Sequence, residues 1–269
     1  MTTSVEDLYG QVWADESGLE AELQDSLDPR GTEWLFERFA ELEPQPGQLV
    51  ADLGARDAVH TIRLVQAYGL RGIALDPVPL HVERAQKAVA DAGLGDAIDV
   101  VQAAVELMPV DDEAVDWIWC RDVLVHVDLA RGFAECARIL RTGGYMLAYV
   151  TCATPLLEPR EANELFEALA IVPESMDPAR VKSQATAACL TLVDEVALGG
   201  EWRERMIEDG SWDPGDDLIR LSRLDRREPE LVARYGRAQV AAYLAGRRWG
   251  VYQLLGKLRP TVYLWRRDA

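Results

Sequence analysis

From residue 44 onward, short apolar runs alternate with amphipathic stretches along the chain. Runs of four to six largely apolar residues predict strands. The stretches between them repeat apolar residues three or four positions apart, which predicts helices. The predicted strands span residues 48–53, 72–75, 98–102, 115–120 and 145–150, and the predicted helices span 58–68, 82–92 and 129–140. Strands alternating with helices through short links predict a parallel sheet covered on both faces.

The flanking segments complete this picture. Residues 1–43 read as helical, because Leu35, Phe39 and Leu42 form one apolar stripe before Pro44 breaks the pattern. In the second half, residues 155–188 carry two helical patterns, 201–256 are mainly helical, and 190–198 and 261–265 read as strands. The sequence therefore predicts an α/β fold with a seven-stranded, mostly parallel sheet, helices on both faces and a helical cap.

Length and composition limit the class of protein. With 269 residues and 49% apolar residues, the chain can bury a full core as one large domain. No apolar run approaches the ~18 residues that a membrane helix needs. The start, MTTSVEDLYG, has neither the basic nor the apolar region of an export signal. We therefore expect a soluble, cytoplasmic protein that does not bind membranes.

The net charge of −18 disfavours nucleic acid as a partner, because an acidic protein repels phosphate backbones. The charge is also uneven. From Arg220 to the end, 12 basic and four acidic residues give +8, so residues 1–219 carry −26. Either this basic part packs on the acidic body, or some of its arginines face an anionic substrate, and charge complementarity alone supports both.

The four cysteines suggest neither a disulfide framework nor a metal site. Cys120, Cys136, Cys152 and Cys189 form no CxxC pair, and no histidine stands at metal-ligand spacing. We expect reduced thiols and no bound metal.

Two acidic residues close the first two strands of the predicted sheet. The first strand ends in Asp52-Leu53-Gly54 before a helix, and a sharp turn of this kind brings backbone N–H groups close to a ligand. The second strand ends at Asp76, 24 residues after Asp52, where a carboxylate can accept both hydroxyls of a ribose. By itself this pair fits any nucleoside-binding α/β fold.

Three later segments narrow the choice among nucleoside-binding α/β folds. They read VQAAVELMPVDDEAVD (residues 101–116), WIWCRDVLVHV (117–127) and ECARILRTGG (135–144). With the first turn, and in this order and spacing, they resemble the class I S-adenosylmethionine-dependent methyltransferases over about residues 48–150. The resemblance implies a Rossmann-like sheet and S-adenosyl-L-methionine as cofactor. It implies methyl transfer to an oxygen, nitrogen or carbon atom of a small-molecule metabolite.

The resemblance also implies roles for individual residues. Those assigned to the cofactor are Asp52 and Gly54 (methionine part), Asp76 (ribose), Val105 and Glu106 (adenine), and Cys120, near the transferred methyl with Arg121 and Asp122. Where the family has its second and third glycines, this chain has Arg56 and Ala58, and Ala104 replaces the acid that binds the adenine amino group. Arg56 either contacts the cofactor carboxylate or crowds the pocket, and Thr142-Gly143-Gly144 matches a structural turn.

Two residues are candidates for the catalytic base because of the way their side chains ionise. His126 is a candidate base because an unperturbed histidine titrates near working pH, and Asp122 is a second candidate. Each could instead cap a helix, and His126 could also be a core residue. His60 and His81 lie in helical contexts that predict solvated side chains.

Candidates for binding the acceptor are spread along the chain. Tyr9 and Trp13, four residues apart, either form a lid or pack on the body. Arg121 lies near the expected methyl position. Arg248 and Tyr252 precede the last strand, in the region where this family builds acceptor pockets, although core packing explains them as well. Trp117 and Trp119 share one strand face, which predicts core packing.

We therefore divide the chain into an N-terminal helical lid (1–43), a cofactor-binding core (44–154), and the remaining strands with substrate-cap insertions (155–269) in the same domain. Alternative functions are an RNA or protein methyltransferase, or an inactive nucleoside-binding regulatory protein. The sequence leaves a homodimer open.

Overall fold

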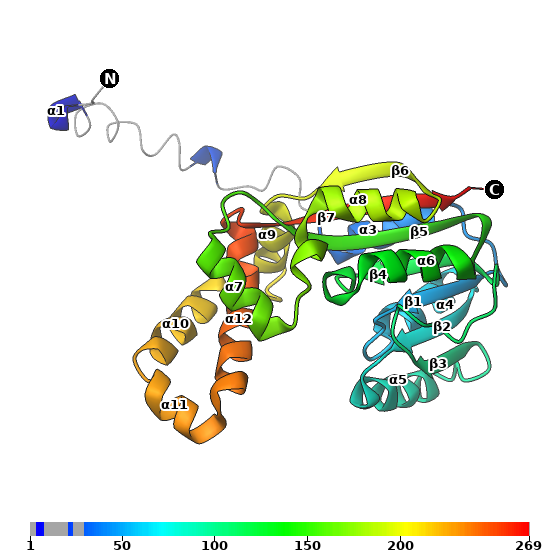
Figure 1. The fold of residues 1–269 in the computed structure, drawn as a ribbon, viewed down its shortest axis with the longest axis horizontal. Coiled ribbons are helices and arrows are strands. Elements are labelled where there is room, and N and C mark those ends of the chain that lie inside the picture. The colour runs from blue at the N-terminus through cyan, green and yellow to red at the C-terminus, as the bar shows by residue number, and fades with distance from the viewer. Residues whose placement is uncertain (1–3, 8–20, 24–29, 269) are drawn as a thin grey trace.

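A seven-stranded sheet runs through the computed structural model, which describes residues 4–7, 21–23 and 30–268 (Figure 1). Its strand order is β3-β2-β1-β4-β5-β7-β6. The strands are β1 (Leu49–Leu53), β2 (Arg71–Asp76), β3 (Ile98–Gln102), β4 (Val115–Arg121), β5 (Leu140–Ala153), β6 (Leu190–Ala197) and β7 (Leu258–Arg267). Strands β1 to β5 pair in parallel, whereas β7 is antiparallel to β5 and β6. The predicted α/β fold is confirmed.

Helices cover both faces of this sheet. The helices in the described part of the chain are α1 (Val5–Asp7), α3 (Thr32–Ala40), α4 (Val59–Tyr68), α5 (Pro79–Asp91), α6 (Leu129–Ile139), α7 (Pro159–Leu169), α8 (Pro178–Ala187), α9 (Glu201–Glu208), α10 (Pro214–Asp225), α11 (Glu228–Tyr235) and α12 (Arg237–Leu254), with 3₁₀ turns η2 (Leu124–His126) and η3 (Pro173–Met176). Helices α10, α11 and α12 extend beyond the sheet, and we call them the arm (Figure 1). No helix in the described part of the chain is long and apolar enough to cross a membrane.

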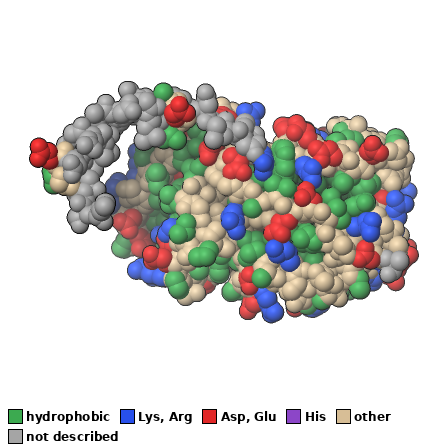
Figure 2. Space-filling view, turned by 90° about the horizontal axis from the view of Figure 1, so that it is seen from above, with side chains coloured by type: hydrophobic (Ala, Val, Ile, Leu, Met, Phe, Trp, Pro, Cys, Tyr) green, Lys and Arg blue, Asp and Glu red, His purple; other side chains and the backbone are tan. Residues whose placement is uncertain are grey.

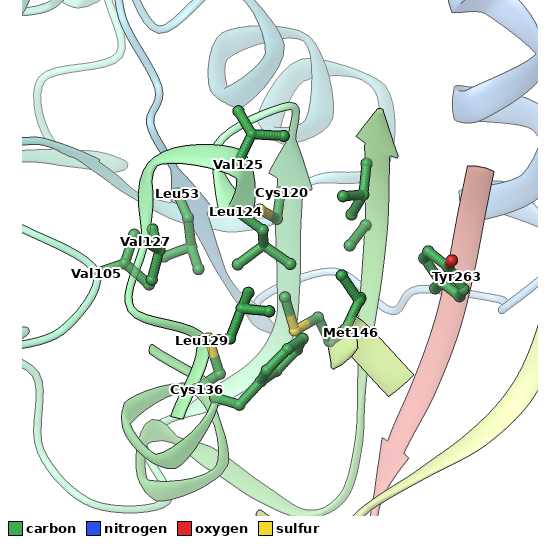
Figure 3. Packing of buried hydrophobic residues seen from close by; sticks show 14 of the residues in the cluster. Leu53, Val105, Cys120, Leu124, Val125, Val127, Leu129, Cys136, Met146 and Tyr263 are labelled. Atoms are coloured by element: carbon green, nitrogen blue, oxygen red, sulfur yellow. The ribbon is translucent and has the colours of Figure 1, made fainter. Parts of the chain in front are cut away.

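Two hydrophobic clusters hold the helices on the sheet. One cluster joins α6 and α8 to the sheet, and in Figure 3 Leu124, Leu129 and Met146 belong to it. The other lies under α3, α4 and α5, where Trp119 stacks on Phe36 with ring centroids 4.8 Å apart. Trp117 and Trp119 both belong to this second cluster, so their predicted role in core packing is confirmed.

The turn predicted at residues 142–144 differs in detail from the structure. Strand β5 begins at Leu140 instead of Tyr145, because Leu140 already pairs with Val115 of β4. The register then jumps, so that Trp117 pairs with Tyr145, and Gly143 takes a positive φ of 78°. The three residues therefore form an irregularity within the strand.

Ion pairs join the basic C-terminal part to the acidic body. Arg248 pairs with Glu164 at 3.0 Å, Lys257 pairs with Glu161, and Arg267 pairs with Glu113 at 2.9 Å. On the face in Figure 2, acidic and basic side chains are interspersed. These pairs support the interpretation that the basic part packs on the body.

Candidate active site

The carboxyl ends of β1, β2 and β4 meet at one edge of the sheet, since these strands are parallel neighbours. Asp52 pairs with Ala74 of β2 and with Trp119 of β4. Because the chain leaves β1 toward β2 while β4 lies on the other side of β1, the strand order changes direction here. Ligands of open α/β sheets bind in the crevice at such a point.

The turn after β1 has three residues in the left-handed region. Gly54, Arg56 and Ala58 have φ values of 68°, 55° and 58°. The positions at which the family usually has glycine therefore keep the glycine-like conformation, although two of them carry side chains. Gly54 also packs closely on the loop after β4, because a Cβ added there would lie 1.9 Å from Val123 Cγ2.

Asp76 is held by the turn that it faces. Its Oδ2 accepts a hydrogen bond from the Arg56 N–H at 3.0 Å, and its Oδ1 accepts one from the Val78 N–H at 2.9 Å. The His81 Nδ1 lies 3.1 Å from Oδ1, so His81 is not the free surface residue that the sequence suggested. A carboxylate has about four acceptor positions. One position on Oδ2 therefore remains for a sugar hydroxyl, and a second hydroxyl would have to displace His81.

Asp52 is buried beside this pair of turns. Its Oδ2 accepts a 2.6 Å hydrogen bond from the Thr61 hydroxyl, which favours the charged form. Burial outweighs this bond and raises the pKa of Asp52 to about 7. The guanidinium of Arg121 acts against this rise, and the carboxylate of Asp76 adds to it. Asp52 therefore changes charge near neutral pH.

The end of β4 supplies a second acidic group. Asp122 has a φ of 56°, its N–H donates to the Tyr149 carbonyl at 2.7 Å, and its Oδ1 accepts from the Thr151 N–H at 3.0 Å. Burial raises the pKa of Asp122, which makes it a better proton acceptor near neutral pH. Burial also raises the pKa of the Cys120 thiol to about 12, so this thiol stays neutral.

Arg121 lies at the same edge without a carboxylate partner. Its guanidinium faces the rings of Tyr149 and Trp202, at 6.0 and 5.8 Å from their centroids. One nitrogen of this guanidinium lies 3.2 Å from the His60 Nε2. Among the described residues Arg121 forms no ion pair.

His60 is half-buried, which corrects the expectation of a solvated side chain. Trp119 Nε1–H donates to the His60 Nδ1 at 3.2 Å, and burial with nearby arginines lowers the pKa of His60 to about 4. The ring is therefore neutral, and the proton must sit on Nε2, the atom that faces Arg121. Two donors then face each other, so His60 does not hold the guanidinium of Arg121 in place.

Three residues that sequence reasoning missed come to this edge, Arg203, Gln253 and Tyr149, together with Trp202. Arg203 Nε donates to the Gln253 Oε1 at 2.5 Å, and the Gln253 Nε2 donates to the Thr151 Oγ1 at 3.2 Å. Tyr149 and Trp202 complete the group, with ring centroids 4.7 Å apart. Burial lowers the pKa of Arg203, which forms no ion pair in the part of the chain that the structure describes. No local pattern marks these residues, because α9 and α12 bring them to β5 only by packing.

A hollow of about 400 Å³ adjoins this group at Gln253. It is lined by Thr154, Pro155, Leu156, Leu198, Gly199, Gln253, Gly256, Leu258 and Arg259. Its size is within the range of small-molecule sites, and it lies where β5 ends and β7 begins.

The residues expected near the adenine have structural contacts. Val105 is buried in the cluster beneath α6, beside Val127 in Figure 3. The Glu106 Oε1 accepts from the Asp128 N–H at 3.0 Å, and Asp128 in turn caps α6. Ala104 is exposed next to them and carries no polar group.

Of the residues expected to contact the acceptor, some lie at this edge of the sheet and others lie around it. The Nδ1 of His126 lies 3.1 Å from the Ala170 carbonyl, so Nδ1 carries the proton and the exposed ring offers Nε2 as an acceptor. Arg248 is paired with Glu164, as described above. Tyr252 is 9% exposed, with the Lys257 ammonium 5.3 Å from its ring centroid. Tyr9 and Trp13 lie outside the described residues.

Comparisons with known proteins show which family this chain resembles. Residues 51–148 match the family described as "Methyltransferase domain". The chain is 30% identical over 201 residues to the sarcosine/dimethylglycine N-methyltransferase of Halorhodospira halochloris, covering 72% of this chain and 67% of that protein. It is 27% identical to the dimethylglycine N-methyltransferase of Parasynechococcus marenigrum (strain WH8102), covering 68% of this chain and 67% of that one.

A solved structure supports the fold. The geranyl diphosphate C-methyltransferase of Streptomyces coelicolor A3(2), solved with S-adenosyl-L-homocysteine, superposes with a TM-score of 0.60 at 15% identity. The match covers 90% of this chain and 86% of that one.

The chain belongs to the class I S-adenosylmethionine-dependent methyltransferases. It is an enzyme that uses S-adenosyl-L-methionine as cofactor and methylates a small molecule. The interpretation drawn from the strand ends and the later segments is thereby confirmed.

Proposed function

We propose that this enzyme methylates the nitrogen of a small amine that also bears a carboxylate. The observation that carries the proposal is the pair Arg121 and Arg203, two partly buried guanidiniums without an ion pair among the described residues. The named activities of the two relatives, on sarcosine and dimethylglycine, agree with such an acceptor.

A bound carboxylate would balance the positive charges of Arg121 and Arg203 at this edge of the sheet. Withdrawing a cation from water costs free energy unless an opposite charge accompanies it. Burial raises the pKa of the Tyr149 phenol, and the guanidiniums of Arg203 and Arg121 act against this rise, which places both charges near the same ring. A carboxylate held there would accept charge-assisted hydrogen bonds, and a guanidinium can donate two in parallel. The hollow beside Gln253 supplies room for a small acceptor.

We propose that the turns after β1 and β2 hold the cofactor. Gly54 and Arg56 would lie against its methionine part and Asp76 would accept from its ribose, with Val105 and Glu106 next to the adenine. The free acceptor position on Asp76 Oδ2 and the glycine-like conformation of the turn support this placement. The bound cofactor supplies an activated methyl group for an in-line displacement.

The protein then has to align the acceptor and take a proton from its ammonium group. We propose Asp122 for this step, because burial raises the pKa of its carboxyl and its backbone is fixed to Tyr149. His126 is the second candidate, although its ring is exposed. Holding the two reacting atoms at contact distance supplies much of the rate enhancement.

The test compares acceptors that differ in one group. We expect methyl transfer to dimethylglycine and little transfer to 2-(dimethylamino)ethanol, which lacks the carboxylate. Arg121→Gln or Arg203→Gln should raise KM for the carboxylate acceptor about tenfold or more, the size expected for a lost charged hydrogen bond. Arg205→Gln, on the same helix but paired with Glu208, is the matched control. Equal turnover of both acceptors, or equal effects of all three substitutions, would contradict the proposal.

Four further assignments are proposals that rest on the sequence. Residues 1–43 serve as a lid, and residues 155–269 carry the helices that cover the acceptor on the core of residues 44–154. Arg248 and Tyr252 line the route to it. The protein works in the cytoplasm without nucleic acid or membrane, and a homodimer is left open.

A further inference from the structure

The arm encloses a hollow of its own. It measures about 410 Å³ and is lined by Arg220, Arg223, Leu224, Arg227, Leu231, Tyr235, Gln239, Val240 and Tyr243. None of these residues belongs to the candidate active site. The hollow lies where α10 and α11 meet the first turns of α12, at the end of the arm that points away from the sheet (Figure 1). Its volume is within the range of small-molecule sites.

The lining has two chemically distinct parts. The floor is apolar: Leu224 and Val240 are buried, and the half-buried Leu231 of α11 also lines it. The rim is basic, because Arg220 and Arg223 are three residues apart on α10 and Arg227 lies in the turn between α10 and α11. Two phenols and one amide, from Tyr235, Tyr243 and Gln239, add polar groups to the lining.

The rim has more positive charge than its own acids neutralise. Arg220 pairs with Asp216 at 2.7 Å and Arg227 pairs with Glu230 at 2.6 Å. Arg223 forms no ion pair with any residue in the described ranges. This excess stands out in a chain with a net charge of −18, and it favours an anion at the rim.

We propose that this hollow is a second binding site, separate from the active site, for a small amphipathic anion. The ligand class is a single phosphate, sulfate or carboxylate group on an apolar body. Its charged group would accept hydrogen bonds from Arg223, with Arg220 and Arg227 beside it, and its apolar body would cover Leu224 and Val240. The proposal does not depend on the methyl acceptor, because it uses none of the residues that would bind it.

Calorimetry with octyl phosphate as the probe tests the site. We expect saturable binding of octyl phosphate with a stoichiometry of one, and much weaker binding of octanol or inorganic phosphate, each of which matches only one part of the lining. Anionic vesicles of dioleoylphosphatidylglycerol form a further arm. Binding to the vesicles without binding of octyl phosphate would overturn the proposal in favour of a membrane contact, and binding of neither would also overturn it.

Variants separate the site from general charge effects. Arg223→Gln should weaken octyl phosphate binding about tenfold or more, as expected for a lost charged hydrogen bond. Arg226→Gln removes the same charge three residues away, where Arg226 donates to Ser222 Oγ at 2.7 Å and does not line the hollow. Gln239→Trp should block the hollow without changing its charge. Melting temperatures check that the variants fold. Equal losses in Arg223→Gln and Arg226→Gln, or unchanged binding in Gln239→Trp, would refute the proposal.

Discussion

Replacing Gly54 by alanine should destabilise the fold through two separate effects. A side chain at φ 68° adopts the left-handed conformation, which costs roughly 1–2 kcal/mol. The new Cβ would also lie 1.9 Å from Val123 Cγ2, and overpacking of this kind costs about 1–3 kcal/mol. Together the two effects give roughly 2–5 kcal/mol of lost stability.

Gly93 provides a matched control. Its φ is 69°, and a Cβ added there would have no atom within 4 Å. Gly93→Ala should therefore lose only the conformational part, roughly 1–2 kcal/mol. The difference between the two variants measures the close contact of the turn after β1 with the loop after β4.

Urea unfolding followed by tryptophan fluorescence measures both losses, and a double variant tests their cause. Removing the Val123 methyl groups should make room for the new Cβ. Gly54→Ala combined with Val123→Ala should therefore lose less stability than the two single variants together, by about 1–3 kcal/mol. Equal losses for Gly54→Ala and Gly93→Ala, or strict additivity in the double variant, would refute this reasoning.

Three other predictions concern the acidic groups at the same edge. Asp76→Ala should weaken S-adenosyl-L-homocysteine binding by ~1–3 kcal/mol in calorimetry, through lost charge-assisted hydrogen bonds, and unchanged affinity would remove Asp76 from the site. Because the pKa of Asp52 is about 7 in the fold, unfolding releases its proton between about pH 4 and 7, and the stability that this proton confers is lost as the pH rises. Asp52→Asn should thus raise Tm at pH 8 by at least about 3 °C and change it little at pH 4.5, whereas the same offset at both pH values would contradict the pKa. Asp122→Asn should lower kcat about 100-fold and His126→Gln less than tenfold in a methyl-transfer assay, and the reverse order would assign the base to His126.

The local pattern of the sequence was sufficient for the core of the fold. Strand β3 was predicted at its observed bounds, and α4, α5 and α6 to within three residues at each end. Periodicity works for these elements because each buries one face on its neighbours in the chain. The main error, the start of β5, occurred where pairing with β4 extends past a glycine that usually ends regular structure.

The residues of the candidate active site could be predicted from the sequence only in part. Asp52, Asp76, Arg121 and Asp122 could be placed together because they follow parallel strands, whose carboxyl ends meet at one edge. The burial of His60 could not, since a helical pattern does not reveal that Trp119 and Arg121 close over its ring.

The sequence by itself therefore determined the strands, their order along the chain and the acidic groups that follow β1, β2 and β4, because these depend on spacing within short stretches of chain. Only the tertiary structure decided which arginine side chains lie without an ion pair among the described residues. Arg203 and Gln253 are 50 positions apart and meet beside Thr151 through the packing of α9, α12 and β5. Likewise, three helices of the arm have to come together before their residues enclose a hollow. Charge balance in a folded protein depends on which side chains become neighbours, and the local periodicity of a sequence does not show which ones do.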